Sequence, residues 1–304
     1  CKSTIHAMCL YRNHVKLEFQ YLVSTKMAES VKARFRSIKL LKTEPLGNGS
    51  YGMVCKAECD VLMCAAKLIH LTIVSPRNSQ NFEQECHVLS AIKHPNIVQY
   101  LGTHQDPDTQ HQTLIMELMD ESLTSFLERA YISDRAPLPF NVQMNICHDI
   151  ALALRYLHQN NIIHRDLSSN NVLTLGGIKF KVTDFGMSKL ISSRFNVTSL
   201  TQCLGCPAYM SPESLETPPV YSTKLDTFSF GVLTIQIITC KFPDPSLPKK
   251  KVRDPKYPAP IEISVVDVER RKSHIDLIPS THPLLEMVYT CLSYQEQDRL
   301  TVEQ

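Results

Sequence analysis

The chain has 304 residues, of which 43% are hydrophobic and 20% are charged, and its formal net charge is +2. This length fits one large globular unit or two lobes, and the composition is ordinary for a soluble enzyme. The small net charge disfavours a dedicated nucleic-acid or membrane-surface binder, and no apolar run reaches the roughly 20 residues of a bilayer span.

The eleven cysteines are scattered along the chain rather than arranged as a disulfide framework. A chain of this length buries enough apolar surface without covalent cross-links, so we expect free thiols and a reducing, cytoplasmic compartment. Cys203 and Cys206 form a C-x-x-C pair, but a zinc site would need a second pair at ligand spacing, and the remaining cysteines do not supply one.

The chain begins with a basic segment, because residues 1–42 contain nine Lys and Arg against two Glu. We interpret residues 1–37 as an N-terminal extension that is solvated and precedes the first domain. Because the first residue is Cys1 rather than Met, we expect the sequence to start inside a longer product.

Residues 38–117 are predicted to form a small lobe rich in strands, because short apolar runs are separated by Gly, Asn-Gly and Pro. One helix interrupts these strands at residues 79–93, where Cys86 and Leu89 share an apolar face. We expect a hinge at residues 118–122, between this lobe and the rest of the chain.

A glycine-rich run with the pattern G-x-G-x-x-G-x-V begins at Gly47. Glycines let the backbone turn sharply and approach phosphate groups closely. In a dinucleotide-binding fold the pattern opens a helix, and an acidic residue follows about 20 positions later. Here residues 54–59 alternate like a strand and residues 67–75 contain no acid, which disfavours a dinucleotide site. A Walker-type loop is also excluded, because its pattern does not occur.

Two charged residues of the small lobe form a predicted pair. Lys67 lies in the strand that follows the glycine-rich run, and Glu85 lies eighteen residues later in the predicted helix. Alone, a lysine in a strand is usually a solvated side chain. A strand lysine that is held by a helix glutamate can instead place its ammonium group on the α- and β-phosphates of a nucleotide.

Residues 123–304 are predicted to form a larger, mainly helical lobe. Apolar spacing predicts helices near 141–160, 224–240 and 282–292. Residues 242–260 contain six Pro and show no periodicity, so we expect a loop there. A small lobe of strands followed by a larger helical lobe defines an α+β fold class.

The strongest signal is the pattern H-R-D-L-x-x-x-N, which begins at His164 and is followed by Asp184-Phe185-Gly186. The carboxylate of Asp166 can accept the proton of an attacking hydroxyl, and the amide oxygen of Asn171 can bind a metal ion. The carboxylate of Asp184 would bind Mg²⁺ that bridges nucleotide phosphates. Each short motif is common by chance, but their order and spacing together are not.

These motifs, with Ser211-Pro212-Glu213 at the position of an A-P-E motif, resemble the eukaryotic protein kinase family over about residues 38–304. The chain is most similar to the tyrosine-kinase-like group of Ser/Thr kinases. The resemblance implies a bilobal fold, in which a small antiparallel sheet with one helix precedes a larger helical lobe. It also implies transfer of the γ-phosphoryl group of ATP, with Mg²⁺, to protein hydroxyls. Because Gln304 follows Arg299 by only five residues, we expect the last helix of such a domain to be truncated.

The resemblance implies the following site residues, taken position by position. The catalytic residues are Asp166, Lys67, Glu85 and Asn171. The metal ligands are Asn171 and Asp184. The ATP-binding residues are Gly47, Asn48, Gly49, Ser50, Tyr51, Gly52, Val54, Ala65, Lys67, Met116, Glu117, Met119 and Leu173.

The same resemblance implies contacts that support the site. Asp226 would brace the catalytic loop, and Arg299 would pair with Glu213 in the helical lobe. The rings of His164 and Phe185 would stack, as part of a group that also includes Leu89 and Tyr100.

Two departures from the family concern the acceptor hydroxyl. Ser168 stands where Ser/Thr kinases usually have Lys, and Cys206 stands where they have Thr. The chain nevertheless lacks Trp and the Ala-Ala-Arg or Arg-Ala-Ala run typical of tyrosine kinases, so we predict Ser/Thr transfer. A tyrosine or dual-specificity kinase is the alternative. A pseudokinase scaffold is disfavoured, because Lys67, Asp166 and Asp184 are all present.

The expected partners are ATP and protein substrates, with no nucleic acid and no transmembrane segment. Arg165 precedes the catalytic aspartate, and an arginine at this position often receives a phosphate group on the activation segment. Thr198, Ser199 and Thr201 are the candidate acceptors, modified by an upstream activating kinase or by autophosphorylation.

Overall fold

The structure is a computed structural model, and the residues that it describes are 38–49, 52–60, 62–69, 86, 88–105, 112–134, 136–186, 188–190, 206–215, 221–243, 249–252, 261–264 and 272–303. The chain divides into two compact units. Unit 1 comprises residues 1–79 and 99–119, and unit 2 comprises residues 80–98 and 120–304. The division after Met119 falls inside the predicted hinge, whereas residues 80–98, which include part of the predicted small-lobe helix, group with unit 2.

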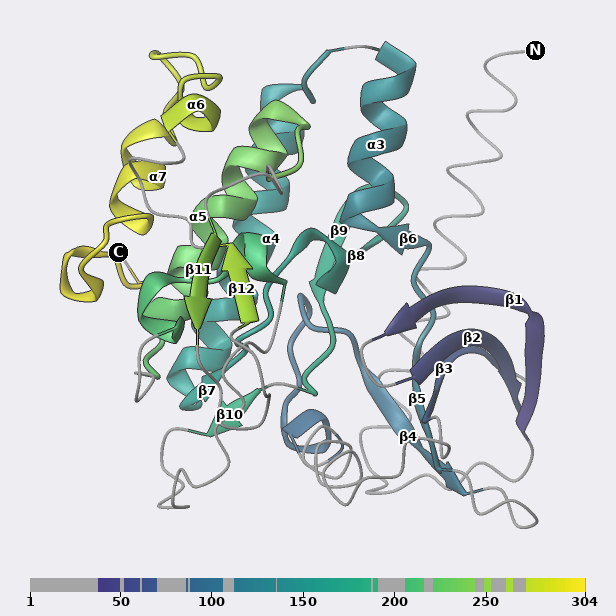
Figure 1. Ribbon diagram of the computed structural model, residues 1–304. Coiled ribbons are helices and arrows are strands. Elements are labelled where there is room, and N and C mark those ends of the chain that lie inside the picture. Colours follow the sequence, from purple (N-terminus) through teal and green to yellow (C-terminus); the bar gives the residue numbers. More distant parts are fainter. Residues whose placement is uncertain are drawn as a thin grey trace. The chain divides into compact units, whose positions relative to one another are not determined.

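Unit 1 is built on a five-stranded antiparallel sheet with the order β1-β2-β3-β5-β4 (Figure 1). Its strands are β1 (Ile38–Gly49), β2 (Gly52–Cys59), β3 (Leu62–Ile69), β4 (Tyr100–Gln105) and β5 (Gln112–Glu117). One face of the sheet carries small apolar side chains that pack into a core. The residues at its centre are Cys55, Ala57, Cys59, Cys64, Ala66 and Ile115. The predicted strand-rich character of this part of the chain is confirmed.

The glycine-rich run lies at the hairpin between β1 and β2. Gly49 is paired with Gly52, and Gly47 is paired with Val54 across the two strands. The chain therefore continues from the glycines into a strand, as expected, and not into the helix that a dinucleotide-binding fold requires.

Unit 2 is mainly helical, with short strands and 3₁₀ turns between the helices. Its helices of the α type are α3 (Leu123–Asp134), α4 (Phe140–Gln159), α5 (Lys224–Thr239), α6 (Lys272–Ile275) and α7 (Leu285–Cys291). Its strands are β6 (Glu121–Ser122), β7 (Ile162–Ile163), β8 (Val172–Leu175), β9 (Lys179–Val182), β10 (Lys189–Leu190), β11 (Lys249–Val252) and β12 (Ile261–Ser264). Its 3₁₀ turns are η3 (Ser169–Asn171), η4 (Pro207–Tyr209), η5 (Pro212–Leu215) and η6 (Glu296–Asp298). An α+β fold with one sheet unit and one helical unit is confirmed.

The helix α5 is buried on all sides, since every residue from Leu225 to Thr239 is buried. A helix that is apolar all round is expected to lie inside a protein rather than on its surface. Helix α7 packs closely on α5 at Gly231 (Figure 1). A Cβ atom at this glycine would lie 2.7 Å from the Cβ atom of Cys291 and 3.2 Å from the side chain of Leu292.

We expect Gly231→Ala to lower the free energy of unfolding by about 1–3 kcal/mol, because overpacking forces the two helices apart. Chemical denaturation monitored by circular dichroism measures this change. Gly47→Ala is the matched control, since no atom lies within 4 Å of the Cβ position there. Equal stability of Gly231→Ala and Gly47→Ala would contradict the close packing of α5 against α7.

The prediction of a loop at residues 242–260 was wrong for Lys249–Val252, which form strand β11. This strand pairs antiparallel with β12, and Lys251 lies opposite Glu262. The six prolines of the segment all lie outside the four paired residues. The stabilising partner is thus a strand beyond the segment, which periodicity within the segment could not reveal.

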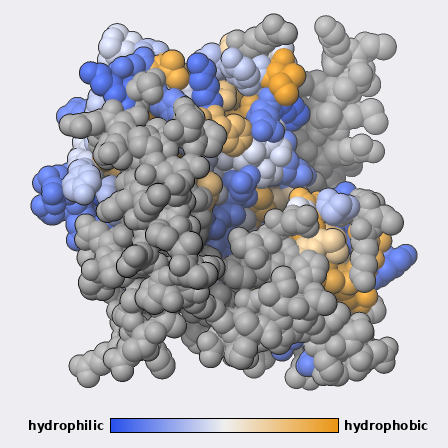
Figure 2. All heavy atoms as spheres, in the orientation of Figure 1, coloured by the Kyte–Doolittle hydropathy of each residue, from blue (hydrophilic) through white to orange (hydrophobic). Residues whose placement is uncertain are grey.

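Exposed apolar side chains of the described residues come from several elements, for example Ile132 in α3, Ile178 between β8 and β9, and Met63 in β3. Figure 2 shows apolar areas in orange among hydrophilic ones on the face it presents. Among the described residues, no helix is long and apolar enough to cross a membrane. The eight cysteines in the described ranges are all free thiols.

Candidate active site

The predicted catalytic loop, residues 164–168, follows β7 and leads into η3. Two residues of the candidate site have a positive φ. Arg165 adopts a φ of 69° and Asp184, two residues after β9, adopts a φ of 63°. The left-handed region costs a residue with a side chain roughly 1–2 kcal/mol. Such a conformation persists where the surrounding structure holds it, and this occurs most often at functional sites.

Asp226, in the first turn of α5, holds the catalytic loop by its backbone. Its Oδ2 atom accepts a hydrogen bond of 2.9 Å from the N–H of His164, and its Oδ1 atom accepts one of 2.9 Å from the N–H of Arg165. The Nε2 atom of His158, in the last turn of α4, lies 2.9 Å from Oδ2. Burial alone would raise the pKa of Asp226, but the hydrogen bond and charge of His158, together with His164, hold it below its usual value. The predicted brace is confirmed.

The carboxylate of Asp166 is held by residues from two other segments. The N–H of Cys206 donates to Oδ1 at 3.0 Å, and the side-chain amide of Asn171 donates to Oδ2 at 3.0 Å. The same amide also donates to the backbone carbonyl of Asp166 at 2.7 Å. These bonds fix the direction of a carboxylate that is predicted to accept a proton.

Burial raises the pKa of Asp166 above its ordinary value. The electrostatic interaction with His164 opposes this shift, and the charge of Asp184 adds to it. The hydrogen bonds from Cys206 and Asn171 lower the pKa, because they stabilise the ionised form. The net effect brings the pKa of this carboxyl closer to neutrality, which suits a general base.

The two predicted metal ligands are brought close together through Thr183. Its N–H donates to the carbonyl of Asn171 at 2.9 Å, so residue 183 is tied to one ligand and is adjacent to the other, Asp184. The carbonyl of Thr183 accepts a hydrogen bond of 2.9 Å from Nε2 of His164. The rings of His164 and Phe185 meet edge to face, with centroids 5.0 Å apart, which confirms this part of the predicted stack.

In unit 1, four predicted ATP-binding residues share one face of the sheet. Val54 lies opposite Lys67 across β2 and β3, and Ala65 lies opposite Met116 across β3 and β5. Side chains of paired residues point to the same face of a sheet, and so do those of residues two apart along a strand. Lys67 is only 3% exposed. A lysine is rarely buried to this extent unless its charge has a function or a partner.

Three further predicted ATP-binding residues are Glu117 at the end of β5, Met119 two residues after it, and Leu173 in β8. The N–H of Glu117 donates to the carbonyl of Gln99 at 3.0 Å, and the N–H of Gln99 donates to Oε1 of Glu117 at 2.7 Å. Met119 is buried, and Leu173 in β8 pairs with Ser122 in β6. The backbone N–H of Glu117 is therefore already hydrogen-bonded to Gln99.

Several predicted residues lie outside the described residues. These are Glu85, Ser50, Tyr51 and the candidate phosphate acceptors Thr198, Ser199 and Thr201. Gly49 and Gly52 are the first paired residues of the β1–β2 hairpin, and the backbone of Asn48 lies beside them in β1.

A buried hydrogen-bonded chain connects the catalytic loop to the turn η4. The hydroxyl of Ser169 lies 3.1 Å from the hydroxyl of Tyr209, which donates in turn to the Oε1 atom of Gln236 in α5. Ser229 donates to the carbonyl of Tyr209 at 2.8 Å. Because Cys206 immediately precedes η4, this chain helps to keep its N–H beside Asp166.

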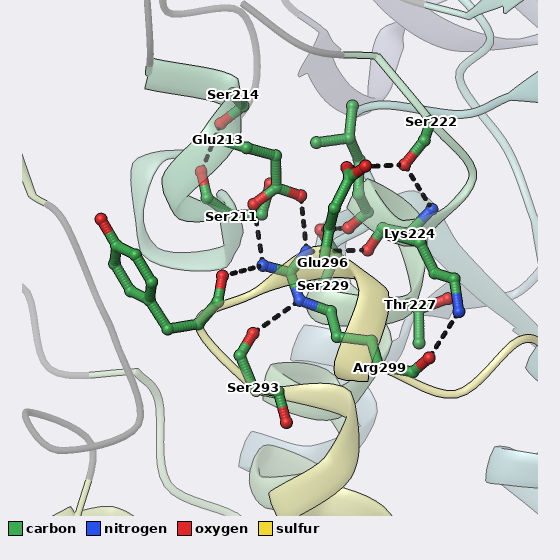
Figure 3. A network of polar contacts seen from close by, with 12 residues as sticks. Ser211, Glu213, Ser214, Ser222, Lys224, Thr227, Ser229, Ser293, Glu296 and Arg299 are labelled. Atoms are coloured by element: carbon green, nitrogen blue, oxygen red, sulfur yellow. Dashed lines mark hydrogen bonds and ion pairs between the residues drawn. The ribbon is translucent and has the colours of Figure 1, made fainter.

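The predicted pair of Glu213 and Arg299 is confirmed as a buried, two-pronged contact (Figure 3). The two Nη atoms of Arg299 lie 2.5 and 2.8 Å from the two carboxylate oxygens of Glu213. The other N–H groups of the guanidinium donate to three backbone carbonyls, those of Lys224, Ser293 and Tyr294. All five donors of the arginine are thus satisfied, as burial of this charge requires.

Sequence reasoning missed three contributors to the site. The N–H of Cys206 holds Asp166, but a backbone donor leaves no trace in residue type. His158 and Tyr221 touch Asp226 and Arg165, respectively. The position of His158 in the last turn of a predicted helix, six residues before His164, was the only available signal.

A family comparison fits this fold and this site. Residues 40–304 match the model of the protein kinase domain, and the chain therefore belongs to the protein kinase family.

Proteins of similar sequence include some that are named as protein kinases. The chain is 33% identical to a probable serine/threonine-protein kinase of Dictyostelium discoideum, over 71% of this chain and 35% of that protein. It is 31% identical to the dual specificity protein kinase shkC of the same organism, over 66% of this chain and 39% of that protein. A putative U-box domain-containing protein of Arabidopsis thaliana is also 31% identical, over 74% of this chain and 27% of that protein. The chain thus spans well under half the length of these relatives.

Proposed function

We propose that this chain is an ATP-dependent protein kinase that transfers the γ-phosphoryl group to Ser and Thr hydroxyls of proteins. The observation that carries the proposal is the held carboxylate of Asp166, which accepts hydrogen bonds from Cys206 and Asn171 on a loop braced by Asp226. A fixed carboxylate with a raised pKa suits the removal of a proton from an attacking hydroxyl.

In the proposed mechanism, the protein mainly orients the reacting groups and stabilises charge. Asp166 orients the acceptor hydroxyl and takes its proton. Lys67 would hold the α- and β-phosphates through its ammonium group. Transfer then occurs in line, with the acceptor oxygen and the leaving oxygen on opposite faces of the phosphorus atom.

Asn171 and Asp184 are the residues that would hold Mg²⁺. The amide nitrogen of Asn171 is used by the two bonds to Asp166, so the amide oxygen is the atom that remains for a cation. No group of three or more His, Cys, Asp or Glu that could hold a metal occurs within the described ranges. Two oxygen ligands nevertheless suit Mg²⁺, which is usually bound by one or two carboxylates together with substrate phosphates and water. When bound, the ion would neutralise charge that develops on the phosphates.

ATP would be bound by the glycine-rich hairpin and by the sheet face that carries Val54, Ala65 and Met116. The proposal adds the backbone of Glu117 and Met119 and the side chain of Leu173 for adenine. Packing within unit 1 does not explain the glycine at position 47, because a Cβ atom there would meet no other atom within 4 Å. A close approach of phosphate groups to the backbone does explain it.

We therefore expect Gly47→Ala to raise the KM for ATP by about tenfold, a cost of about 1.4 kcal/mol, while the melting temperature stays unchanged. Steady-state kinetics with varied ATP, together with thermal unfolding, measure both quantities. The KM for the protein substrate serves as the internal control and should not change. An unchanged KM for ATP would argue against contact of this hairpin with the nucleotide.

The raised pKa of Asp166 predicts how the rate depends on pH. A general base is active only when it is ionised, so kcat/KM should fall on acidification through the raised pKa. The acidic limb should therefore lie above the ordinary aspartate pKa of about 3.9. A pH–rate profile at saturating Mg²⁺ tests this, with thermal unfolding at each pH to exclude denaturation. A limb at or below the ordinary value would contradict the effect of burial.

The choice of Ser/Thr over Tyr rests on the segment after the catalytic aspartate and on the turn that begins at Cys206. The sequence Gly205-Cys206-Pro207-Ala208 keeps the spacing of a Ser/Thr platform, with a weaker hydrogen-bond donor in place of the Thr hydroxyl. Dual-specificity relatives make transfer to Tyr the second candidate. Incubation of the purified domain with labelled ATP, Mg²⁺ and generic protein substrates, followed by phosphoamino-acid analysis, decides between them. Mainly phosphotyrosine would overturn the assignment to Ser and Thr.

The free thiols of the described cysteines support a reducing, cytoplasmic compartment as part of the same proposal. The lobes that we propose are those predicted from the sequence. Residues 38–117 form the small lobe, and residues 123–304, after the hinge, form the larger lobe.

A further inference from the structure

The backbone and the side chain of Arg165 both contact one short segment, residues 221–226. Its N–H donates to Asp226, and its guanidinium lies over the ring of Tyr221, with the Cζ atom 4.4 Å from the ring centroid. An Nη2–H of Arg165 also donates to the Tyr221 hydroxyl at 3.3 Å. Tyr221 and Asp226 are only five residues apart, so the start of α5 and the residues before it contact the backbone and the side chain of the same residue.

The segment that carries Tyr221 is itself fixed in place. The hydroxyl of Ser222 donates to Glu296 at 3.2 Å and accepts the N–H of Lys224 at 3.2 Å (Figure 3). Lys224 contacts Arg299 through its backbone carbonyl and through its ammonium group. The ring of Tyr221 is therefore presented to Arg165 from a firmly anchored stretch of chain.

The backbone of Arg165 requires such a restraint. Its φ of 69° is unfavourable for an arginine, and the next residue is the catalytic Asp166. If Arg165 relaxed to an ordinary conformation, the peptide that joins it to Asp166 would rotate. The carboxylate of Asp166 would then leave the N–H of Cys206 and the amide of Asn171.

We propose that Tyr221 is a positioning residue for phosphoryl transfer, which holds the Arg165 guanidinium by a cation–π contact and so keeps Asp166 in its productive orientation. A cation over an aromatic face is attracted by the negative charge density of the ring, and the attraction increases when water is excluded. The ring, rather than the hydroxyl alone, carries the effect. The inference rests on the proposed kinase activity of the same site.

Two substitutions separate the ring from the hydroxyl. Tyr221→Leu removes the aromatic face and keeps much of the apolar volume, and Tyr221→Phe removes only the hydroxyl. We expect Tyr221→Leu to lower kcat by about tenfold without changing the KM for ATP, and Tyr221→Phe to stay within about threefold of the original enzyme. Tyr289→Leu, at an exposed tyrosine of α7, is the matched control and should leave kcat unchanged. An unchanged kcat in Tyr221→Leu, or an equal loss in both Tyr221 variants, would overturn the proposal.

A double-mutant cycle tests whether Tyr221 acts through Arg165. In an Arg165→Ala background, Tyr221→Leu should cost no further kcat, because the cation is already absent. Fully additive losses would mean that Tyr221 acts by another route, and the proposal would be wrong.

Hydrogen exchange of the backbone gives a readout that does not depend on activity. Amides of residues 163–168 should exchange faster in Tyr221→Leu than in Tyr221→Phe at equal melting temperature. Unchanged exchange would overturn the positioning role. If the original chain transferred no phosphate while Tyr221→Leu still loosened these amides, the proposed function would fail and the structural role of Tyr221 would stand.

Discussion

Replacement of Lys67 by Met, or of Asp184 by Asn, is expected to lower phosphoryl transfer by at least about a hundredfold to a thousandfold. In the proposed mechanism, Lys67 would supply positive charge to the phosphates of ATP and Asp184 negative charge to Mg²⁺, so each substitution removes a charge that the proposed reaction uses. Incorporation of labelled phosphate into a generic substrate measures the loss.

Both variants should remain folded. Circular dichroism and thermal unfolding should match those of the original chain, since neither side chain is part of the apolar core of the sheet. Lys39→Met and Asp276→Asn are the matched controls, because both residues are exposed in the described structure. Turnover close to that of the original chain in both Lys67→Met and Asp184→Asn would refute the proposed mechanism.

Arg299→Ala is expected to lower the free energy of unfolding by about 3–5 kcal/mol. The substitution leaves the buried carboxylate of Glu213 without its cation, and it removes the donors to three backbone carbonyls. With roughly 2–4 °C per kcal/mol for a large domain, the melting temperature should fall by several degrees or more. Differential scanning calorimetry measures the change.

A second ion pair in the same unit serves as the control. Arg129 lies 2.5 Å from Glu121, but its side chain is 61% exposed. Exposed pairs contribute about 0–1 kcal/mol, so Arg129→Ala should change the melting temperature little. Similar effects of Arg299→Ala and Arg129→Ala would show that burial does not distinguish the two pairs.

The sequence predicted those parts of the site in which residue type and spacing determine the chemistry. The catalytic loop and the glycine-rich hairpin each depend on residues that few others could replace. The pair of Glu213 and Arg299, which lie 86 residues apart, was implied by the family resemblance. The long helices α4 and α5 were also predicted within about one residue at each end, because their apolar residues form long, continuous patterns. The apolar pattern of a helix is a local property of the sequence, so these two helices could be predicted directly from it.

Other features depend on partners that are distant in sequence. Helix α3 was not predicted, and the strand β11 is stabilised by pairing with β12. The N–H of Cys206 reaches Asp166 across 40 residues of sequence, and Tyr221 reaches Arg165 across 56. Such contacts arise only when the fold brings the segments together, and the side chains involved have no distinctive spacing.

The burial of α5 has a consequence for how natural variation in this chain should be interpreted. The catalytic loop, the turn η4, the helix α7 and Arg299 all contact this one helix. A substitution inside α5 would therefore reduce abundance in the cell and specific activity together, because quality-control proteases remove proteins that lose only 1–2 kcal/mol of stability. Loss of activity in such a variant would not identify a catalytic residue, whereas loss of activity in a Lys67 variant of normal abundance would support the proposed role of Lys67. Protein level and turnover per molecule must consequently be measured separately before any inactive variant of α5 is assigned to the chemistry.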